Sequence, residues 1–470
     1  MRHLLERSTD LVVRYLSEIE ERPVLCQAEP GELLDLLPEE APEHGEPLDR
    51  ILSDVEQLIL PRLTHWNHPG FMAYFGITGS APGIAGELLA AATNVNAMLW
   101  RTSPAATELE VRVCDWLRRL VGLPDGFEGH INDTASIATL LALAAARHRS
   151  DGSIGQRGMA GRAELPAFTV YASDQAHVSV DKAALVLGLG LDNLRRVASD
   201  EAFRLSVQAL EVAIESDLEA GRRPLAVVAT AGTTSTTSVD PLAAVADVCR
   251  RHSLWLHVDA AYAGNAAICP EHRPRFAGWE AADSIVVNPH KWLFTPLDCS
   301  VLLLRDRQRF TDAFSLVPDY LRSDEESVNL MDLGIQLGRR FRALKLWMVM
   351  RTYGAEGLRA RLREHCRLAR RIASRLEEDE RFDLLMEPPF STVCFRLRAG
   401  RGEDEEQLNQ RLVEAVNAAG EQFVSATRLD GRYVVRLTFG NLRTSEEHVE
   451  AVWRRLDGLA TELAGRRMGR

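Results

Sequence analysis

The 470-residue sequence contains very little lysine. Its 55 lysine and arginine residues include only three lysines, Lys182, Lys291 and Lys345, so arginine supplies almost every positive charge. An arginine stays protonated, whereas a lysine amine can lose its proton and attack a carbonyl to form a Schiff base. Lys182 and Lys345 lie in helical patterns, where we expect ordinary surface lysines. Lys291 is therefore the lysine to examine for a chemical role.

Other absences exclude whole classes of protein. No apolar run approaches the ~20 residues that span a bilayer, and the N-terminus lacks the apolar core of a signal peptide. The net charge of −12, with no basic cluster to offset it, argues against a nucleic-acid surface. Seven cysteines without a CxxC pair indicate free thiols in a reducing compartment. We expect a cytoplasmic protein that binds neither membranes nor nucleic acids.

Two common cofactor sites are also disfavoured. His65 and His68 have a spacing that metal ligands use, but no cysteine or carboxylate lies close by to complete a site. We therefore expect hydrogen-bonded structural histidines and no metal. No GxGxxG motif follows a predicted strand, which argues against a dinucleotide-binding enzyme.

Apolar runs and helical patterns alternate along the middle of the chain. Strands are predicted at residues 168–172, 225–230, 254–258, 285–287 and 300–304, and helices at 178–187 and 241–252. This alternation predicts an α/β fold with a mostly parallel sheet flanked by helices. We expect three parts: an N-terminal helical segment (1–80), a large domain (81–352) and a small C-terminal α/β domain (353–470).

Three chemically useful side chains follow predicted strands. His177, Asp259 and Lys291 each lie at a carboxyl end, and ligands bind at that edge of open α/β sheets. A carboxylate buried there needs a cationic partner, which a protonated ring nitrogen can supply. Thr234 adds a hydroxyl at the same edge.

A loop of small polar residues ending at Ser136 opens a helix, as phosphate sites do. Taken alone, this loop is better explained by an ordinary helix cap from Asp133 or Thr134. A Schiff-base lysine, a carboxylate for a pyridinium nitrogen and a helix N-terminus for phosphate together indicate pyridoxal 5'-phosphate (PLP).

Four motifs resemble those of the group II PLP-dependent amino acid decarboxylases, most closely the aromatic-L-amino-acid decarboxylase branch. The resemblance runs from the His65-Trp66 cluster to the C-terminus and implies a fold type I PLP enzyme. It also implies a homodimer with shared active sites, in which the N-terminal segment wraps the partner. The motifs are His257-Val258-Asp259-Ala260-Ala261-Tyr262-Ala263-Gly264, Asn288-Pro289-His290-Lys291-Trp292, Ser173-Asp174-Gln175-Ala176-His177 and Leu337-Gly338-Arg339-Arg340-Phe341-Arg342.

The resemblance implies a role for each matched residue. Lys291 would form the Schiff base with the cofactor, Asp259 would face its pyridine nitrogen, and Thr234 would lie near the ring and the scissile carboxylate. His177 and Ala261 would pack on the two faces of the ring. The residues that match the phosphate-binding positions are Thr134, Ala135, Ser136, Asn288 and His290.

The resemblance also bears on the substrate. Trp66, Tyr74 and Phe75 match aromatic pocket positions, which favours tyrosine, tryptophan, phenylalanine or dopa as the substrate. The chain departs from the animal enzymes at Gly76 and Ile77, where they have Pro-Thr, and at Met98, where they have Phe. No basic residue replaces these, so an acidic substrate is disfavoured. We expect decarboxylation of an aromatic L-amino acid to the amine and CO2.

One further departure affects the reaction. The family has a mobile loop whose tyrosine donates a proton at the active site of the neighbouring subunit. Leu330 occupies that position here, and Tyr320 matches a different tyrosine before the loop. Relatives without this tyrosine carry out oxidative decarboxylation-deamination, so an aromatic aldehyde synthase is the alternative. A non-catalytic homologue that acts by association is a second alternative, but the intact Lys291, Asp259 and His177 argue against it.

Overall fold

The computed structural model describes residues 2–316, 328–400 and 402–465, which form two compact units. Unit 1 comprises Met1–Gly76, Arg370–Leu385 and Val393–Arg470, and unit 2 comprises Ile77–Ala369 and Met386–Thr392. The first 76 residues thus group with the C-terminal segment, whereas the sequence suggests separate parts. Among the described residues, no helix combines the length and apolar character needed to cross a membrane.

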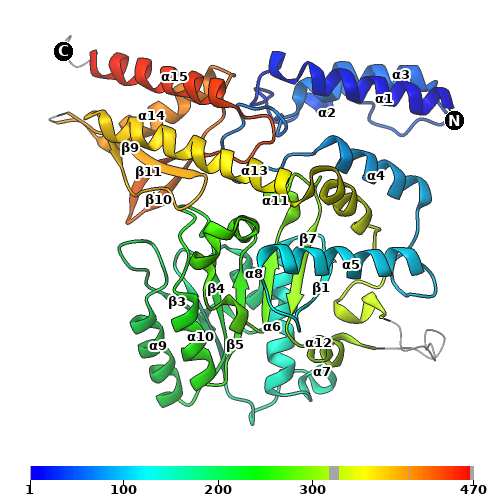
Figure 1. Cartoon of the computed structure of the whole chain (residues 1–470), viewed down its shortest axis with the longest axis vertical. Coiled ribbons are helices and arrows are strands. Elements are labelled where there is room, and N and C mark those ends of the chain that lie inside the picture. The colour runs from blue at the N-terminus through cyan, green and yellow to red at the C-terminus, as the bar shows by residue number, and fades with distance from the viewer. Residues whose placement is uncertain (1, 317–327, 401, 466–470) are drawn as a thin grey trace. The chain divides into compact units, whose positions relative to one another are not determined.

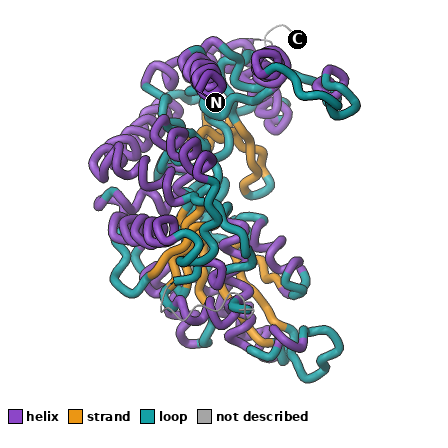
Figure 2. The backbone as a smooth tube through the Cα atoms, turned by 90° about the vertical axis from the view of Figure 1, so that its right-hand side faces the viewer, coloured by secondary structure: helices purple, strands orange, loops and turns teal. Residues whose placement is uncertain are grey.

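Unit 2 is built on a seven-stranded sheet with the order β1-β7-β6-β5-β4-β2-β3. Figures 1 and 2 show its strands with helices beside them. Strand β7 is antiparallel to both of its neighbours, β1 and β6, and the other strand pairs are parallel, so the expected mostly parallel sheet is confirmed. The strands are β1 (Glu128–Asn132), β2 (Phe168–Ser173), β3 (Leu194–Val197), β4 (Arg223–Thr230), β5 (Trp255–Asp259), β6 (Ser284–Val287) and β7 (Ser300–Leu304).

Helices flank this sheet, which explains why its central strands read as apolar runs. The Ala/Leu-rich helix α6 packs against β4, β5, β6 and β7, and Leu141 on it joins a core cluster with Val228, Val286 and Leu302. The other helices of unit 2 are α4 (Ala81–Thr93), α5 (Pro104–Val121), α7 (Ile154–Arg157), α8 (Ser179–Val186), α9 (Val207–Glu219), α10 (Leu242–Arg251), α11 (Pro289–Trp292) and α12 (Arg307–Phe314); α6 itself is Ala135–Ser150.

Unit 1 contains a four-stranded sheet with the order β10-β11-β9-β8. Residues of the N-terminal segment extend it, because the backbone N–H of Met72 donates to Phe423 and the N–H of Thr438 donates to Met72. The histidines expected to be structural are hydrogen-bonded there, His65 to the Tyr15 hydroxyl and His68 to the N–H of Gly70. Its elements are α1 (Arg2–Ser17), α2 (Glu32–Leu36), α3 (Leu48–Asp54), β8 (Phe382–Leu384), β9 (Thr392–Leu397), α14 (Glu405–Ala418), β10 (Ser425–Leu429), β11 (Arg432–Thr438) and α15 (Glu446–Gly465).

The long helical segment α13 (Ala343–Glu378) begins in unit 2 and ends in unit 1. It is interrupted at Gly354, whose φ of +60° and ψ of 172° are not helical. A glycine adopts this conformation without the steric penalty of a Cβ atom.

Charged and polar side chains around the buried Asp217 link helix α9 to strands β2 and β3 at one edge of the larger sheet. Asp217 of α9 accepts hydrogen bonds from the Tyr171 hydroxyl at 2.7 Å, from Arg195 at 2.7 Å and from Arg222 at 2.9 Å. Burial alone would raise the pKa of Asp217, but the bonds from these three partners outweigh it and lower the pKa to about 2. The ionised carboxylate therefore stabilises the fold.

We predict that Asp217→Asn lowers the free energy of unfolding by about 2 kcal/mol at pH 7, because it removes the buried carboxylate charge that the hydrogen bonds from Tyr171, Arg195 and Arg222 stabilise. The folded-state pKa lies below the ordinary value of 3.8, so the wild-type advantage is complete above that value and disappears as pH falls toward 2. Urea denaturation from pH 7 to pH 3 measures this. The control Asp247→Asn removes an exposed pair with Arg250 and should cost under ~1 kcal/mol. Equal effects of the two substitutions would contradict the prediction.

Candidate active site

The sheet of unit 2 brings the predicted side chains to one edge. Asp259 is the last residue of β5, and the strand register pairs it with Thr230 of β4 and Val286 of β6. Parallel neighbours with this register end together, so the segments that follow them start from the same edge. The predicted residues placed there are Thr134 after β1, His177 after β2, Thr234 after β4, and Asn288, His290 and Lys291 after β6.

The pKa of His177 is affected by two charged residues of this group, Asp259 and Lys291. The pKa of its imidazole is lowered, chiefly because the surrounding protein desolvates the ring, although the side chain is exposed in the single chain. The carboxylate of Asp259 opposes this shift and the ammonium of Lys291 adds to it. All three groups therefore lie within electrostatic reach of one another, and the His177 ring is neutral at neutral pH.

Asp259 is a buried carboxylate, with 7% of the residue exposed. One oxygen, Oδ1, accepts the backbone N–H of Ala261 at 3.1 Å. No arginine or lysine among the described residues forms an ion pair with it, yet a buried carboxylate is costly unless a cation compensates it. A protonated pyridine nitrogen would supply that cation, so the chemistry of this position fits PLP.

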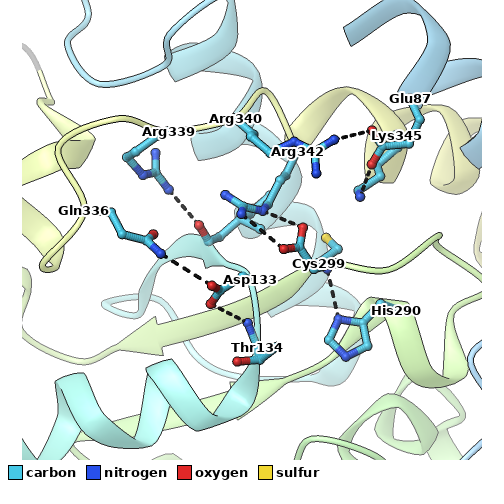
Figure 3. Close-up of polar contacts among 12 residues, drawn as sticks. Glu87, Asp133, Thr134, His290, Cys299, Gln336, Arg339, Arg340, Arg342 and Lys345 are labelled. Atoms are coloured by element: carbon cyan, nitrogen blue, oxygen red, sulfur yellow. Dashed lines mark hydrogen bonds and ion pairs between the residues drawn. The ribbon is translucent and has the colours of Figure 1, made fainter. Parts of the chain in front are cut away.

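The segment that carries Lys291 is held from several sides. The N–H of Cys299 donates to Nδ1 of His290 at 2.9 Å (Figure 3). The Ser300 hydroxyl donates to Oδ1 of Asn288 at 2.6 Å. Burial lowers the pKa of His290 to about 3, and the adjacent Lys291 adds to the shift. The ring is therefore neutral, and because Nδ1 accepts, Nε2 carries the proton.

That Nε2 lies 3.2 Å from Nδ2 of Asn288. The side chains of Asn288 and His290 are therefore in hydrogen-bond contact and hold each other in place.

The first turn of α6 is also suited to an anion. Thr134 is its N-cap residue, but no side chain caps the helix, so the ordinary cap suggested by the sequence alone is not formed. Asp133 instead accepts the N–H of Thr134 at 2.7 Å, and Gln336 donates to its other oxygen at 3.4 Å (Figure 3). The helix N-terminus at Ala135 and Ser136 therefore keeps its positive end for a ligand such as phosphate.

The arginine-rich motif at residues 337–342 holds the neighbouring backbone in place through hydrogen bonds and ion pairs. Arg339 donates to Glu110 at 2.6 Å and to the carbonyl of Ile131 at 2.7 Å, which fixes the end of β1. Arg342 pairs with Asp298 at 2.8 Å, one residue before Cys299 (Figure 3). Sequence reasoning matched this motif to the family without assigning it a role. It missed Asp298, Cys299 and Ser300, which carry no local signal.

The expectation of a surface lysine at position 345 is wrong. Lys345 is only 1% exposed and forms an ion pair with Glu87 of α4 (Figure 3). Gly86 makes the burial possible, because a Cβ at that position would lie 2.5 Å from the Cα of Lys345. Lys182 is exposed, as expected.

The residues predicted to line the substrate pocket belong to both units. In unit 1 the rings of Trp66 and Tyr74 stack with centroids 6.1 Å apart, and Trp66 also stacks on Phe71 at 4.3 Å. Phe75 lies 4.6 Å from the guanidinium of Arg436. Met98 lies in unit 2 and is half-buried. The aromatic pocket as a whole therefore stays a prediction.

Leu330, which the family resemblance matches to the loop tyrosine, is only 2% exposed. It begins the short helix Leu330–Leu333 and packs in the core cluster of unit 2. Its alkyl side chain has no acidic proton to donate. Tyr320 lies outside the described residues.

Comparisons with known proteins agree with these features. The model of the pyridoxal-dependent decarboxylase conserved domain matches residues 30–398. Tyrosine decarboxylase 2 of Narcissus pseudonarcissus is 42% identical over 477 residues, covering 98% of this chain and 94% of the relative. Phenylacetaldehyde synthase of Arabidopsis thaliana is 41% identical over 468 residues, covering 97% and 94%. The crystal structure of Oryza sativa TDC with PLP and tryptamine matches with a TM-score of 0.94 at 39% identity over 98% of each chain.

Proposed function

Because the chain belongs to the pyridoxal-dependent decarboxylase family, we propose that it converts an aromatic L-amino acid to the amine and CO2. It is a PLP-dependent carboxy-lyase, as the family model and the decarboxylase relatives indicate. The observation that carries the proposal is the meeting of Lys291, Asp259 and His177 at one sheet edge, where, among the described residues, no arginine or lysine forms an ion pair with the buried Asp259 carboxylate.

The residues of this edge would bind different parts of PLP. Lys291 would hold it covalently through its amine, and Asp259 would keep the ring nitrogen protonated. His177 and Ala261 would pack against the two ring faces. The residues that would bind the phosphate are Thr134, Ala135, Ser136, Asn288 and His290. When bound, PLP supplies an electron sink for the electron pair left as CO2 departs.

The reaction consumes one proton, which a side chain or water must supply. The bond between Cα and the carboxylate breaks, CO2 leaves, and a proton is added to Cα to give the amine. Leu330 carries no transferable proton, so the donor is another group: His177, Lys291 or water. Thr234 lies on the segment after β4, where its hydroxyl can orient the carboxylate that leaves.

The substrate class follows from the side chains at the predicted pocket. Trp66, Tyr74, Phe75 and Met98 offer aromatic and apolar surface, which favours an aromatic side chain over an acidic one. The guanidinium beside Phe75, that of Arg436, is buried and donates to the Tyr74 carbonyl. Relatives named tyrosine decarboxylase and tryptophan decarboxylase, at about 40% identity, support the same class.

We also propose that the enzyme is a cytoplasmic homodimer with shared active sites. Helix α1 has no buried residue in the single chain, although Leu5, Val12 and Val13 form apolar exposed surface on it. A partner subunit wrapped by the N-terminal segment would cover these side chains.

We predict that the PLP-loaded protein, given tyrosine, tryptophan, phenylalanine or dopa in air, releases CO2 and the corresponding amine in equal amounts. Following CO2, amine, aldehyde and peroxide together measures this, with glutamate as the control substrate that should not react. Turnover of glutamate in preference to every aromatic amino acid would overturn the substrate assignment. Absence of any CO2 release would overturn the proposed reaction.

An aromatic aldehyde synthase is the second candidate. Two observations favour it: the apolar Leu330 at the position of the loop tyrosine, and the relative named phenylacetaldehyde synthase at 41% identity. In that reaction dioxygen accepts two electrons. One amino acid, O2 and water give one aldehyde, CO2, ammonia and hydrogen peroxide.

A pair of substitutions separates the two candidates. If Leu330 directs the reaction toward aldehyde, Leu330→Tyr should raise the amine-to-aldehyde ratio by about tenfold or more, because it restores a phenol that can donate a proton. Leu330→Phe adds the same ring without the hydroxyl and serves as the matched control. An equal ratio in the two variants would show that the hydroxyl at position 330 does not decide the product.

A further inference from the structure

A cavity of about 820 Å³ lies at the amino edge of the larger sheet, opposite the edge that carries Lys291. It is bounded by the start of β4 at Arg223 and by Leu254, just before β5. The C-terminal ends of α6 and α10 and the residues after β7 complete its wall. The cavity therefore belongs to unit 2 and shares no residue with the candidate active site.

Arginine dominates the charge of this cavity. Its lining contains five arginines (Arg149, Arg223, Arg250, Arg305 and Arg309) and a single carboxylate, Asp283. Two further carboxylates, Asp247 and Asp306, pair with Arg250 and Arg309 from the margin. Arginines still outnumber carboxylates five to three, in a chain whose net charge is −12.

The described carboxylates neutralise only part of this charge. Arg149 and Arg309 share Asp283, at 3.6 and 3.4 Å. The guanidinium of Arg305 donates to the carbonyls of Ala282 and Glu280, which occupy two of its five N–H groups and leave its charge uncompensated. Among the residues that the structure describes, no carboxylate pairs with Arg223 or Arg305. Burial lowers the pKa of Arg149, and the nearby Arg309 adds to the shift while Asp283 opposes it.

Helix capping explains only part of the cluster. Arg149 and Arg250 lie at the C-terminal ends of α6 and α10, where the helix dipole favours cations. Arg223 opens a strand, Arg305 follows one, and Arg309 lies in the first turn of α12, where the dipole disfavours a cation. Helix capping therefore accounts for two of the five arginines, although Arg223 and Arg305 also lie over the rings of Phe168 and Phe127.

We propose that this cavity binds a polyphosphate carried on an organic body, as in a nucleoside polyphosphate. The guanidinium group matches two phosphate oxygens with two parallel hydrogen bonds, and several forks around one cavity suit a multivalent anion. The volume falls within the ~300–1,000 Å³ of small-molecule sites. Pro224, Leu225 and Leu256 line the remaining wall and can contact an organic body.

Isothermal titration calorimetry of the PLP-loaded protein with ATP and with inorganic pyrophosphate tests the proposal. Loading with PLP keeps the phosphate-binding end of the active site occupied. We expect one molecule bound per chain, with an affinity that falls as NaCl is raised. Arg223→Gln and Arg309→Gln should each weaken binding by about tenfold or more, because each removes a charge-assisted hydrogen bond.

Arg157→Gln is the matched control, since Arg157 is exposed, pairs with Glu164 and lies outside the cavity. Arg223→Lys retains the charge without the fork and should fall between wild type and Arg223→Gln. Melting temperatures of all variants show whether each is folded. The proposal is overturned if neither polyphosphate binds, if adenosine binds as tightly as ATP, or if both glutamine variants bind like wild type. Binding that disappears when PLP is loaded would also overturn it.

Discussion

The active-site architecture depends on the ends of parallel strands meeting at one edge of the sheet. The register that pairs Thr230 with Asp259, and Asp259 with Val286, fixes a carboxylate beside the segment that carries Lys291. That carboxylate is buried and has no cationic protein partner among the described residues. Because an uncompensated buried charge is costly, a protonated ring nitrogen such as that of PLP would supply the cation that this carboxylate needs. The chemistry of this edge therefore fits the cofactor that the family uses.

Hydrogen bonds and ion pairs around this edge also hold its functional groups in position. His290 and Asn288 are held by Cys299 and Ser300 at the start of β7, the antiparallel strand. Arg339 joins Glu110 to the end of β1, which leads into the first turn of α6. Segments far apart in the sequence are therefore locked together where an anion would bind. Such positioning is what a cofactor enzyme contributes beyond the chemistry of the cofactor itself.

The sequence predicted the parts that depend on local pattern. Apolar runs located β2, β4, β5, β6 and β7, and the family motifs located the residues now found at one edge. It missed β1 and β3, because polar residues such as Asn132 and Arg195 interrupt their apolar pattern. The burial of Lys345 depends on Gly86 in another helix, and the arginine cavity gathers residues from Arg149 to Arg309. Neither long-range juxtaposition leaves a signal in a single stretch of sequence.

The most direct test of the account is to reduce the PLP-loaded protein with borohydride and map the modified lysine by peptide mass spectrometry. The chain offers only three lysines, so the experiment has few possible outcomes. The account predicts pyridoxyl modification of Lys291 alone, with loss of the visible absorbance. Modification of the exposed Lys182 or of the buried Lys345 instead, or none at all, would contradict the assignment of this sheet edge as the active site.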